Sequence, residues 1–163
     1  MTEKDRLEGK RILIVDDEPD ILDTLEDLLS MCELERASTF EQAKMYLESE
    51  SFDLAILDIM GVDGYRLLEV ANDRKVPAVM LTAHALSPDN IVKSFKKGAA
   101  YYIPKDEMVN ITTFLHDIFE AMQEGKSSWW KWYDRLAGFC DKKFGPTWQD
   151  GDKDFWEKFR YYI

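Results

Sequence analysis

The sequence predicts an α/β protein, a doubly wound five-stranded parallel β-sheet followed by a C-terminal helical extension. Two patterns support this prediction. Short apolar runs rich in β-branched residues lack polar alternation, which is typical of strands buried on both faces. These runs alternate five times with amphipathic helical patterns within about 124 residues, the signature of a doubly wound sheet. Because such sheets bind ligands at the carboxyl ends of their strands, a functional site is expected at that edge.

Composition and charge limit the number of domains and the kinds of partner that the protein can bind. The chain has 163 residues, 45% of them hydrophobic, which suits one domain with an extension. A formal net charge of −11 argues against binding to nucleic acid, whose phosphates attract a basic surface. The charge is uneven: from Gly125 onward there are 8 basic and 6 acidic residues, about +2, whereas the first 124 residues carry −13.

Several features together predict a soluble cytoplasmic protein. The first ten residues, MTEKDRLEGK, are charged and contain no apolar segment, so a signal peptide is not expected. No run approaches the ~18 apolar residues of a membrane span. Cys32 and Cys140 lie far apart and show neither metal-binding spacing nor a disulfide framework, so two reduced thiols are expected.

The first half of the chain predicts three strands, each followed by a helix. The strands are RILIV, ELERA and DLAIL, at residues 11–15, 33–37 and 53–57. ELERA alternates weakly and fits an outer strand. Pro19 opens the first helix, because proline is favoured in a first helical turn. Thr39 and Gln42 form a capping-box pattern that opens the second helix, and the third covers about Asp63 to Asn72.

The next part of the chain, from residue 76 to about residue 124, predicts two more strands and two more helices. VPAVML (76–81) and AYYI (100–103) are the strands. Between them, Ser87 and Pro88 start a helix that Gly98 closes. A long helix follows, marked by apolar residues at helical spacing: Ile111, Phe114, Leu115, Ile118, Phe119 and Met122.

An aromatic-rich pattern beyond residue 125 predicts a helical hairpin with Ser128 as its first cap. Two apolar stripes flank the break GPTWQDGD: Trp129, Trp132, Tyr133, Leu136, Phe139, Cys140 and Phe144, then Phe155, Trp156, Phe159, Tyr162 and Ile163. Two interpretations stay open. The stripes pack on the preceding domain and extend its core, or they form a recognition or dimerisation element, since Trp and Tyr are enriched at interface hot spots. The small positive charge disfavours membrane-surface association, and the lack of a basic recognition helix disfavours DNA binding.

Polar residues follow the predicted strands where each strand ends: Asp16 and Asp17, Asp58, Thr82, and Lys105. Three carboxylates at one edge repel one another unless a cation neutralises them, and all-oxygen ligands suit Mg²⁺. Phosphoryl transfer requires this kind of charge neutralisation, with Asp58 as the candidate nucleophile. Lys105 would pair with the phosphoryl oxygens, and the Thr82 hydroxyl would donate to another of them.

Four segments of the sequence resemble the signature segments of the response-regulator receiver domain of two-component signalling. They are ILIVDDEPD, LAILDIM with DGYRLL, VMLTAHA, and GAAYYIPK, in the same order and spacing. The resemblance covers residues 10–124, between an N-terminal segment, 1–9, and the hairpin extension, 125–163. It implies a flavodoxin-like sheet of strand order 2-1-3-4-5. It also implies a phosphoryl group received from a phosphohistidine of a sensor histidine kinase or phosphotransfer protein.

The resemblance also assigns roles to individual residues of this chain. Asp58 matches the phosphoacceptor, and Lys105 matches the phosphate-pairing lysine. Thr82 and Tyr102 match the switch hydroxyl and the switch aromatic. The expected Mg²⁺ ligands are Asp16, Asp17, Asp58 and the backbone carbonyl of Met60. Ala83 matches the small residue that lets the phosphate approach, and His84 lies where a side chain can tune loss of the phosphate.

Two departures from the family pattern bear on the site. The turn after Asp58 is about two residues shorter than usual and lacks a proline, which affects where the Met60 carbonyl points. Asp106 follows Lys105, where the family has a proline joined by a cis peptide bond. Without proline a cis bond costs about 2.5–4 kcal/mol, so a trans bond is expected here.

These departures keep an alternative open, a degenerate receiver that acts as a non-phosphorylated interaction scaffold. A phosphatase-type enzyme is disfavoured because Asp58 is followed by Ile59 and Met60 rather than by an Asp-x-Asp pair, so the chain is not expected to be an enzyme. For a working receiver, phosphorylation is expected to turn Tyr102 inward. The change would alter the surface of the fourth helix, fifth strand and fifth helix, and would loosen or re-dock residues 129–163. Output would then pass through protein contacts of this hairpin, with a partner or a second copy.

Overall fold

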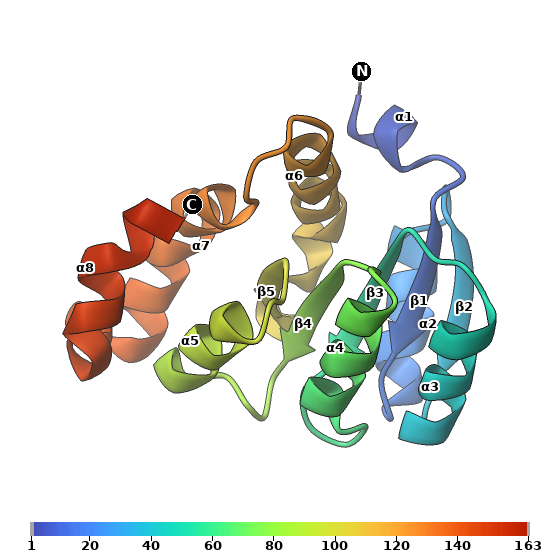
Figure 1. Cartoon of the computed structure of the whole chain (residues 1–163), viewed down its shortest axis with the longest axis horizontal. Coiled ribbons are helices and arrows are strands. Elements are labelled where there is room, and N and C mark those ends of the chain that lie inside the picture. The colour runs from blue at the N-terminus through green and yellow to red at the C-terminus, as the bar shows by residue number, and fades with distance from the viewer. Residues whose placement is uncertain (1, 163) are drawn as a thin grey trace.

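The computed structural model describes residues 2–162, without the side chains of Arg160 and Tyr162, and contains a five-stranded parallel sheet with helices on both faces (Figure 1). The strands are β1 (Arg11–Val15), β2 (Glu33–Ala37), β3 (Leu54–Asp58), β4 (Ala78–Thr82) and β5 (Tyr101–Pro104). Their order is β2-β1-β3-β4-β5 and every neighbouring pair is parallel. The predicted fold class and strand order are confirmed.

The register of the strands brings their carboxyl ends to one edge of the sheet. Val15 pairs with Leu57, Asp58 with Leu81, and Thr82 with Pro104. Every residue of β3, β4 and β5 is buried, as expected of strands covered on both faces, whereas β2 lies at the edge and is partly exposed. The residues that end β3 and β4, and those that follow β1 and β5, therefore meet at the same place.

The helices of the first domain begin and end where the local sequence predicts. They are α2 (Pro19–Leu28), α3 (Phe40–Ser49), α4 (Gly64–Asp73), α5 (Pro88–Lys96) and α6 (Ile111–Gln123), with a 3-10 helix, η1, over Lys105–Asn110. Thr39 accepts a hydrogen bond from the Gln42 amide, and Ser87 caps α5 in the same way. The reciprocal bond expected of a capping box is made one residue earlier, from the Ser38 amide to Gln42.

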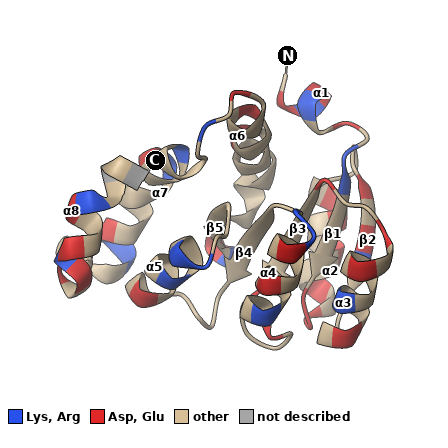
Figure 2. Cartoon of the chain, viewed as in Figure 1, with Lys and Arg blue, Asp and Glu red and all other residues tan. Residues whose placement is uncertain are grey.

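A short N-terminal helix, α1 (Glu3–Leu7), was not predicted, because five residues with one apolar side chain give no periodic signal. Leu7 is fully buried, and Arg6 donates to the side chain of Gln123 on α6. Acidic residues are spread over many elements (Figure 2), and the sequence of α2, PDILDTLEDL, contains no basic residue. No helix within residues 2–162 is long and apolar enough to cross a membrane.

The extension forms the predicted hairpin from α7 (Trp129–Phe144), the 3-10 helix η2 (Trp148–Asp152) and α8 (Lys153–Tyr162). It lies beside α5 and β5 (Figure 1, orange to red). Trp132, Leu136 and Cys140 are 2% exposed or less and belong to the same core as the sheet. Much of the two stripes thus extends the core, whereas Tyr133 is 39% exposed. Ile163 and the side chain of Tyr162 lie outside the described residues.

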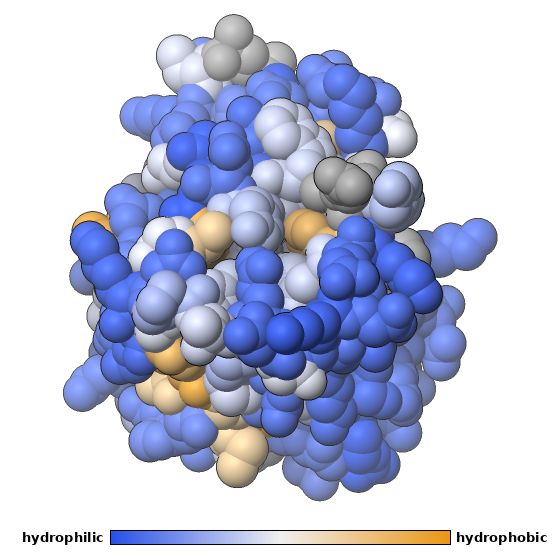
Figure 3. Space-filling model, turned by 90° about the vertical axis from the view of Figure 1, so that its left-hand side faces the viewer, coloured by the Kyte–Doolittle hydropathy of each residue, from blue (hydrophilic) through white to orange (hydrophobic). Residues whose placement is uncertain are grey.

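The extension also covers the open edge of β5. The indole N–H groups of Trp129 and Trp132 donate to the backbone carbonyls of Ala99 and Tyr102, each at 2.8 Å. Ser128 occupies the N-cap position as predicted, but its hydroxyl donates to the carbonyl of Ala100 instead of capping α7. Side chains therefore satisfy the carbonyls of an edge that would otherwise be open to another strand. The outward face of this region is mostly hydrophilic, with small hydrophobic patches between the hydrophilic residues (Figure 3).

The buried indole hydrogen bond of Trp132 predicts that replacing this residue destabilises the protein much more than replacing Trp130, another tryptophan of α7. Trp132→Phe leaves the Tyr102 carbonyl unpaired and a small void in the core, so the free energy of unfolding should fall by about 1–3 kcal/mol. Trp130, which is 38% exposed, is the control, and Trp130→Phe should change stability by less than about 0.5 kcal/mol. Urea unfolding measures both, and equal losses would contradict this role of Trp132.

Candidate phosphorylation site

Four of the predicted site residues lie together at the carboxyl edge of the sheet. Asp58 ends β3, Thr82 ends β4, Asp16 follows β1 and Lys105 follows β5. Asp16 and Thr82 are fully buried, and Asp58 is 4% exposed. Burying polar and charged groups is costly unless they are paired, so the arrangement depends on a buried partner for the two carboxylates.

Lys105 is that partner. Its ammonium nitrogen lies 2.9 Å from Oδ2 of Asp16, 3.6 Å from Oδ1 of Asp58 and 3.2 Å from Oε1 of Glu18. The lysine side chain is only 7% exposed, so these contacts are weakly screened by water. The peptide bond from Lys105 to Asp106 is trans, as predicted.

The pKa values reflect an excess of buried negative charge. Burial, followed by the charge of Asp16, raises the pKa of Asp58 to about 7 against the opposing effect of Lys105. Burial also raises the pKa of Asp16. For Lys105, burial lowers the pKa, but the bond to Asp16 and the charge of Asp58 outweigh it, and the pKa is raised. The lysine stays charged, whereas Asp58 loses its proton only near neutral pH.

An acidic cluster beside these residues has the chemistry of a hard-cation site. Carboxylate oxygens of Asp16, Asp17 and Glu18 lie within 4.8 Å of one another. Oδ2 of Asp16 is buried, and its charge partner is the Lys105 ammonium, 2.9 Å away. Clustered carboxylate oxygens that repel one another fit Mg²⁺. Asp58 is not a member of this cluster.

Glu18 is the residue that sequence reasoning missed. Its carboxylate contacts Lys105, and its backbone amide donates to Oδ1 of Asp16 at 2.9 Å. The signal was available in the acidic run at positions 16 to 18, although Glu18 alone resembles an ordinary residue before a helix.

His84 lies at the exposed rim of the site. Its side chain is 75% exposed, and its Nε2 lies 3.8 Å from Oε1 of Glu18.

The shortened turn after Asp58 still reaches the acidic cluster. Gly61 has a φ of +82°, and a Cβ atom there would lie 2.5 Å from Oδ2 of Asp17. A Cβ atom at Gly64 would lie 2.1 Å from the carbonyl oxygen of Asp58. Both glycines are therefore required by close approach, and the backbone at Gly61 passes directly beside Asp17. Met60, whose carbonyl is an expected metal ligand, precedes Gly61 and is 53% exposed.

The two predicted switch residues are linked through the loop after β4. The amide of Ala85 donates to Oγ1 of Thr82, and the Tyr102 hydroxyl donates to the carbonyl of Ala85, each at 2.9 Å. Tyr102 is fully buried. The Tyr102 ring is thus already inward in this structure, and the expected inward turn on phosphorylation stays a prediction.

A doubly wound sheet of this strand order, with clustered acids, a hydroxyl and a lysine at the carboxyl edge, is the architecture of a signalling receiver domain. Comparison with known proteins agrees. Residues 12–115 match the family model for the response regulator receiver domain. The chain belongs to this family.

Individual relatives support the same assignment. Two-component response regulator ARR10 of Arabidopsis thaliana is 36% identical over 147 residues, covering 82% of this chain and 25% of that protein. Response regulator GtcR of Aneurinibacillus migulanus is 38% identical over 102 residues, covering 60% of this chain and 42% of that protein. The chain thus spans less than half the length of these curated relatives.

The receiver fold has counterparts among solved structures. A CheY-like response regulator receiver domain from Methanospirillum hungatei JF-1 matches with a TM-score of 0.59 and 33% identity, covering 69% of this chain and 97% of that one. The family match ends at residue 115, before α7 begins at Trp129. The helical extension is therefore a feature beyond the matched receiver domain.

The close approach of Gly64 predicts that Gly64→Ala is strongly destabilising. Its Cβ atom would overlap the Asp58 backbone, so the free energy of unfolding should fall by about 2–4 kcal/mol. Gly138 is the matched control because a Cβ atom there meets nothing within 4 Å, and it lies within α7. Gly138→Ala should be neutral or stabilising by up to about 1 kcal/mol. Denaturant unfolding distinguishes these, and a harmless Gly64→Ala would contradict the tight turn.

The raised pKa of Asp58 predicts pH-dependent stability in the metal-free protein. The native state holds this proton more tightly than the unfolded chain, so stability falls as pH rises from the ordinary value of 3.8 toward about 7. Asp58→Asn removes the charge and should stabilise the protein more at about pH 8 than at about pH 5, by on the order of 1–3 kcal/mol. Unfolding in a chelator at both pH values measures this. An equal effect at both would show that Asp58 titrates normally.

Proposed function

We propose that the chain is a phosphorylation-controlled response regulator of the cytoplasm. Asp58 would accept a phosphoryl group from a phosphohistidine of a sensor histidine kinase or phosphotransfer protein. The observation that carries the proposal is the buried Asp58 carboxylate, 3.6 Å from Lys105, at the edge that also holds Asp16 and Thr82. An isolated buried acid would be costly, so this grouping favours a charged ligand over a purely structural role.

The residues of this chain would divide the reaction between them. A carboxylate oxygen of Asp58 attacks phosphorus, forming the O–P bond as the P–N bond to the histidine breaks. The Lys105 ammonium, now shared between Asp16 and Asp58, would turn to the incoming phosphoryl oxygens. The Thr82 hydroxyl accepts from Ala85, so its proton is available for donation to the same group.

Mg²⁺ is the cofactor that the acidic cluster fits. Asp16 and Asp17 would hold it, and Asp58 and the Met60 carbonyl are the further expected ligands. A bound cation neutralises the phosphoryl oxygens and the clustered carboxylates. It also opposes the burial that raises the pKa of Asp58, and so favours the carboxylate form that acts as nucleophile.

A small phosphodonor tests the proposal directly. Wild-type protein treated with acetyl phosphate and Mg²⁺ should gain the mass of one phosphoryl group, whereas Asp58→Asn should gain none. Asp63→Asn is a matched control because Asp63 is an exposed acid in the same turn, with a φ of 55° that asparagine tolerates. It should behave as wild type. Equal uptake by the Asp58→Asn variant would contradict the assigned acceptor.

The degenerate receiver is the second candidate, favoured by the shortened turn and by Asp106. It would act as a non-phosphorylated interaction scaffold. No phosphoryl uptake by wild type at any Mg²⁺ concentration would support it. Catalytic phosphate release from added substrates would instead indicate a phosphatase-type enzyme, which the sequence disfavours.

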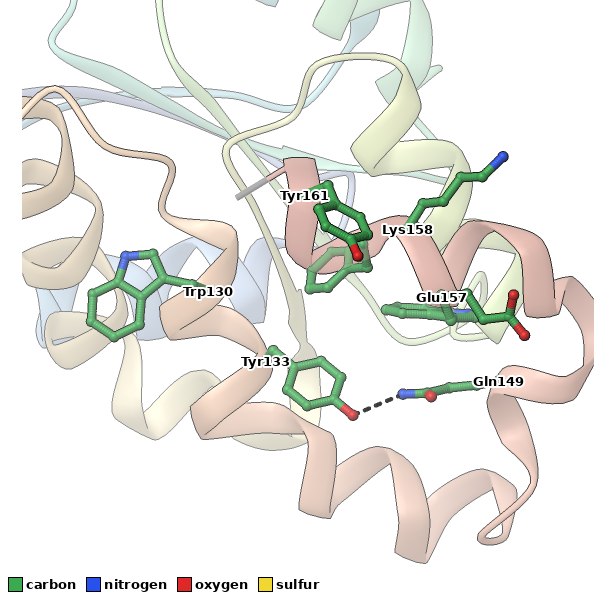
Figure 4. Close-up of a pocket in the computed structure, with 8 residues that line it drawn as sticks. Trp130, Tyr133, Gln149, Glu157, Lys158 and Tyr161 are labelled. Atoms are coloured by element: carbon green, nitrogen blue, oxygen red, sulfur yellow. Dashed lines mark hydrogen bonds between the residues drawn. The ribbon is translucent and has the colours of Figure 1, made fainter.

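Under either candidate, output is proposed to pass through protein contacts of residues 129–163, to a partner or in a homodimer. A hollow of about 750 Å³ lies between α7 and α8 (Figure 4). Its lining includes Tyr133, which accepts a hydrogen bond from Gln149, and the exposed Tyr161. Aromatic side chains of this kind are favoured at protein interfaces. The charge pattern supports neither nucleic acid nor a membrane as the partner.

A further inference from the structure

A small hollow connects the candidate phosphorylation site to the extension. It measures about 220 Å³ and is lined by Thr82, Ala83, Leu86, Lys105, Asp106 and Lys143. Thr82 and Lys105 are the residues assigned to the phosphoryl group. Lys143 comes from the last turn of α7, outside the receiver domain. The extension therefore contributes a cation to the wall of the site.

The position of Lys143 is set by the docking of α7 rather than by a flexible side chain alone. Trp132 donates to the carbonyl of Tyr102 on β5, and Arg135 forms a bidentate pair with Asp117 on α6, which is 3% exposed. Cys140, one turn before Lys143, is 1% exposed. These contacts direct the end of α7 to the carboxyl edge of the sheet.

The present partner of Lys143 holds it weakly. Its ammonium nitrogen lies 3.9 Å from Oδ2 of Asp106, and the two side chains are 50% and 66% exposed. Exposed pairs at this distance contribute little to stability, so the lysine can exchange its partner at low cost. Lys105, in contrast, is engaged by three carboxylates of the site.

We propose that Lys143 is a second phosphoryl-binding cation, supplied by the extension, and that phosphorylation of Asp58 therefore tightens the docking of α7. The inference rests on the proposed function and deepens it. Phosphorylation replaces one negative charge with about two and adds strong acceptor oxygens beside Lys105, which lines the hollow with Lys143. Lys143 gains more from these oxygens than from the single exposed carboxylate of Asp106. The sequence predicted that the hairpin would loosen or re-dock, and tighter docking is opposite to the first of these outcomes.

Beryllofluoride, formed from beryllium and fluoride with Mg²⁺, is the probe because it mimics the phosphoryl group on an aspartate. We compare wild type with Lys143→Met, Lys143→Arg and Lys142→Met. Lys142 is the matched control, since it is an exposed lysine in the same turn of α7. The measurements are beryllofluoride affinity and hydrogen exchange of residues 129–144 with and without the probe.

Wild type should bind the probe and gain protection in α7. Lys143→Met should weaken binding about three- to tenfold and lose the added protection, Lys143→Arg should keep both, and Lys142→Met should stay within about twofold of wild type. Wild-type affinity and protection in Lys143→Met would overturn the inference while leaving the proposed function intact. Reduced protection of α7 in wild type on binding would also overturn it. Absence of binding in all four proteins would overturn the proposed function and the inference together.

Discussion

The buried ammonium of Lys105 is the interaction on which the site depends. Asp16 and Asp58 lie at adjacent strand ends because the register of a parallel sheet puts them there, and burial would make their shared charge prohibitive. One ammonium offsets this only in part. The uncompensated negative charge raises the pKa of Asp58, and burial also raises the pKa of Asp16. Because the site holds more negative than positive charge, it favours binding of a cation. It also favours a ligand that binds Lys105 more strongly than the present carboxylates do.

The extension places a second constraint on the receiver. The Trp132 indole donates to the carbonyl of Tyr102, the Tyr102 hydroxyl donates to the carbonyl of Ala85, and the Ala85 amide donates to the hydroxyl of Thr82. The candidate phosphorylation site and α7 are therefore joined by contiguous contacts within about one layer of side chains. A continuous chain of contacts does not by itself couple two sites. Coupling requires a structural element that has two arrangements, and each site must shift the balance between them. Because Tyr102 is already inward, the docking of α7 is the better candidate for that element than the tyrosine ring.

Much of this arrangement could be predicted from sequence because it depends on local pattern and strand topology. The apolar runs located the strands, and parallel strands must present Asp16, Asp58 and Lys105 at one edge. The inward position of Tyr102 could not be predicted, since its hydroxyl donates to the carbonyl of Ala85, a contact between β5 and the loop after β4. Helix α1 was missed for a related reason, because its stability comes from burying Leu7 rather than from its own periodicity.

The two departures from the family pattern are compensated within this chain, the second of them only in part. The shortened turn is accommodated by Gly61 and Gly64, which allow the backbone to pass against Asp17 and Asp58. Asp106 adds a negative charge where the family has a neutral proline, and Lys143 of the extension lies within ion-pair distance of it. This exposed pair offsets the added charge only in part, so Lys143 can turn to a ligand in the hollow at low cost. The cation that meets Asp106 comes from α7 and not from the receiver domain, which links the substitution at position 106 to the extension.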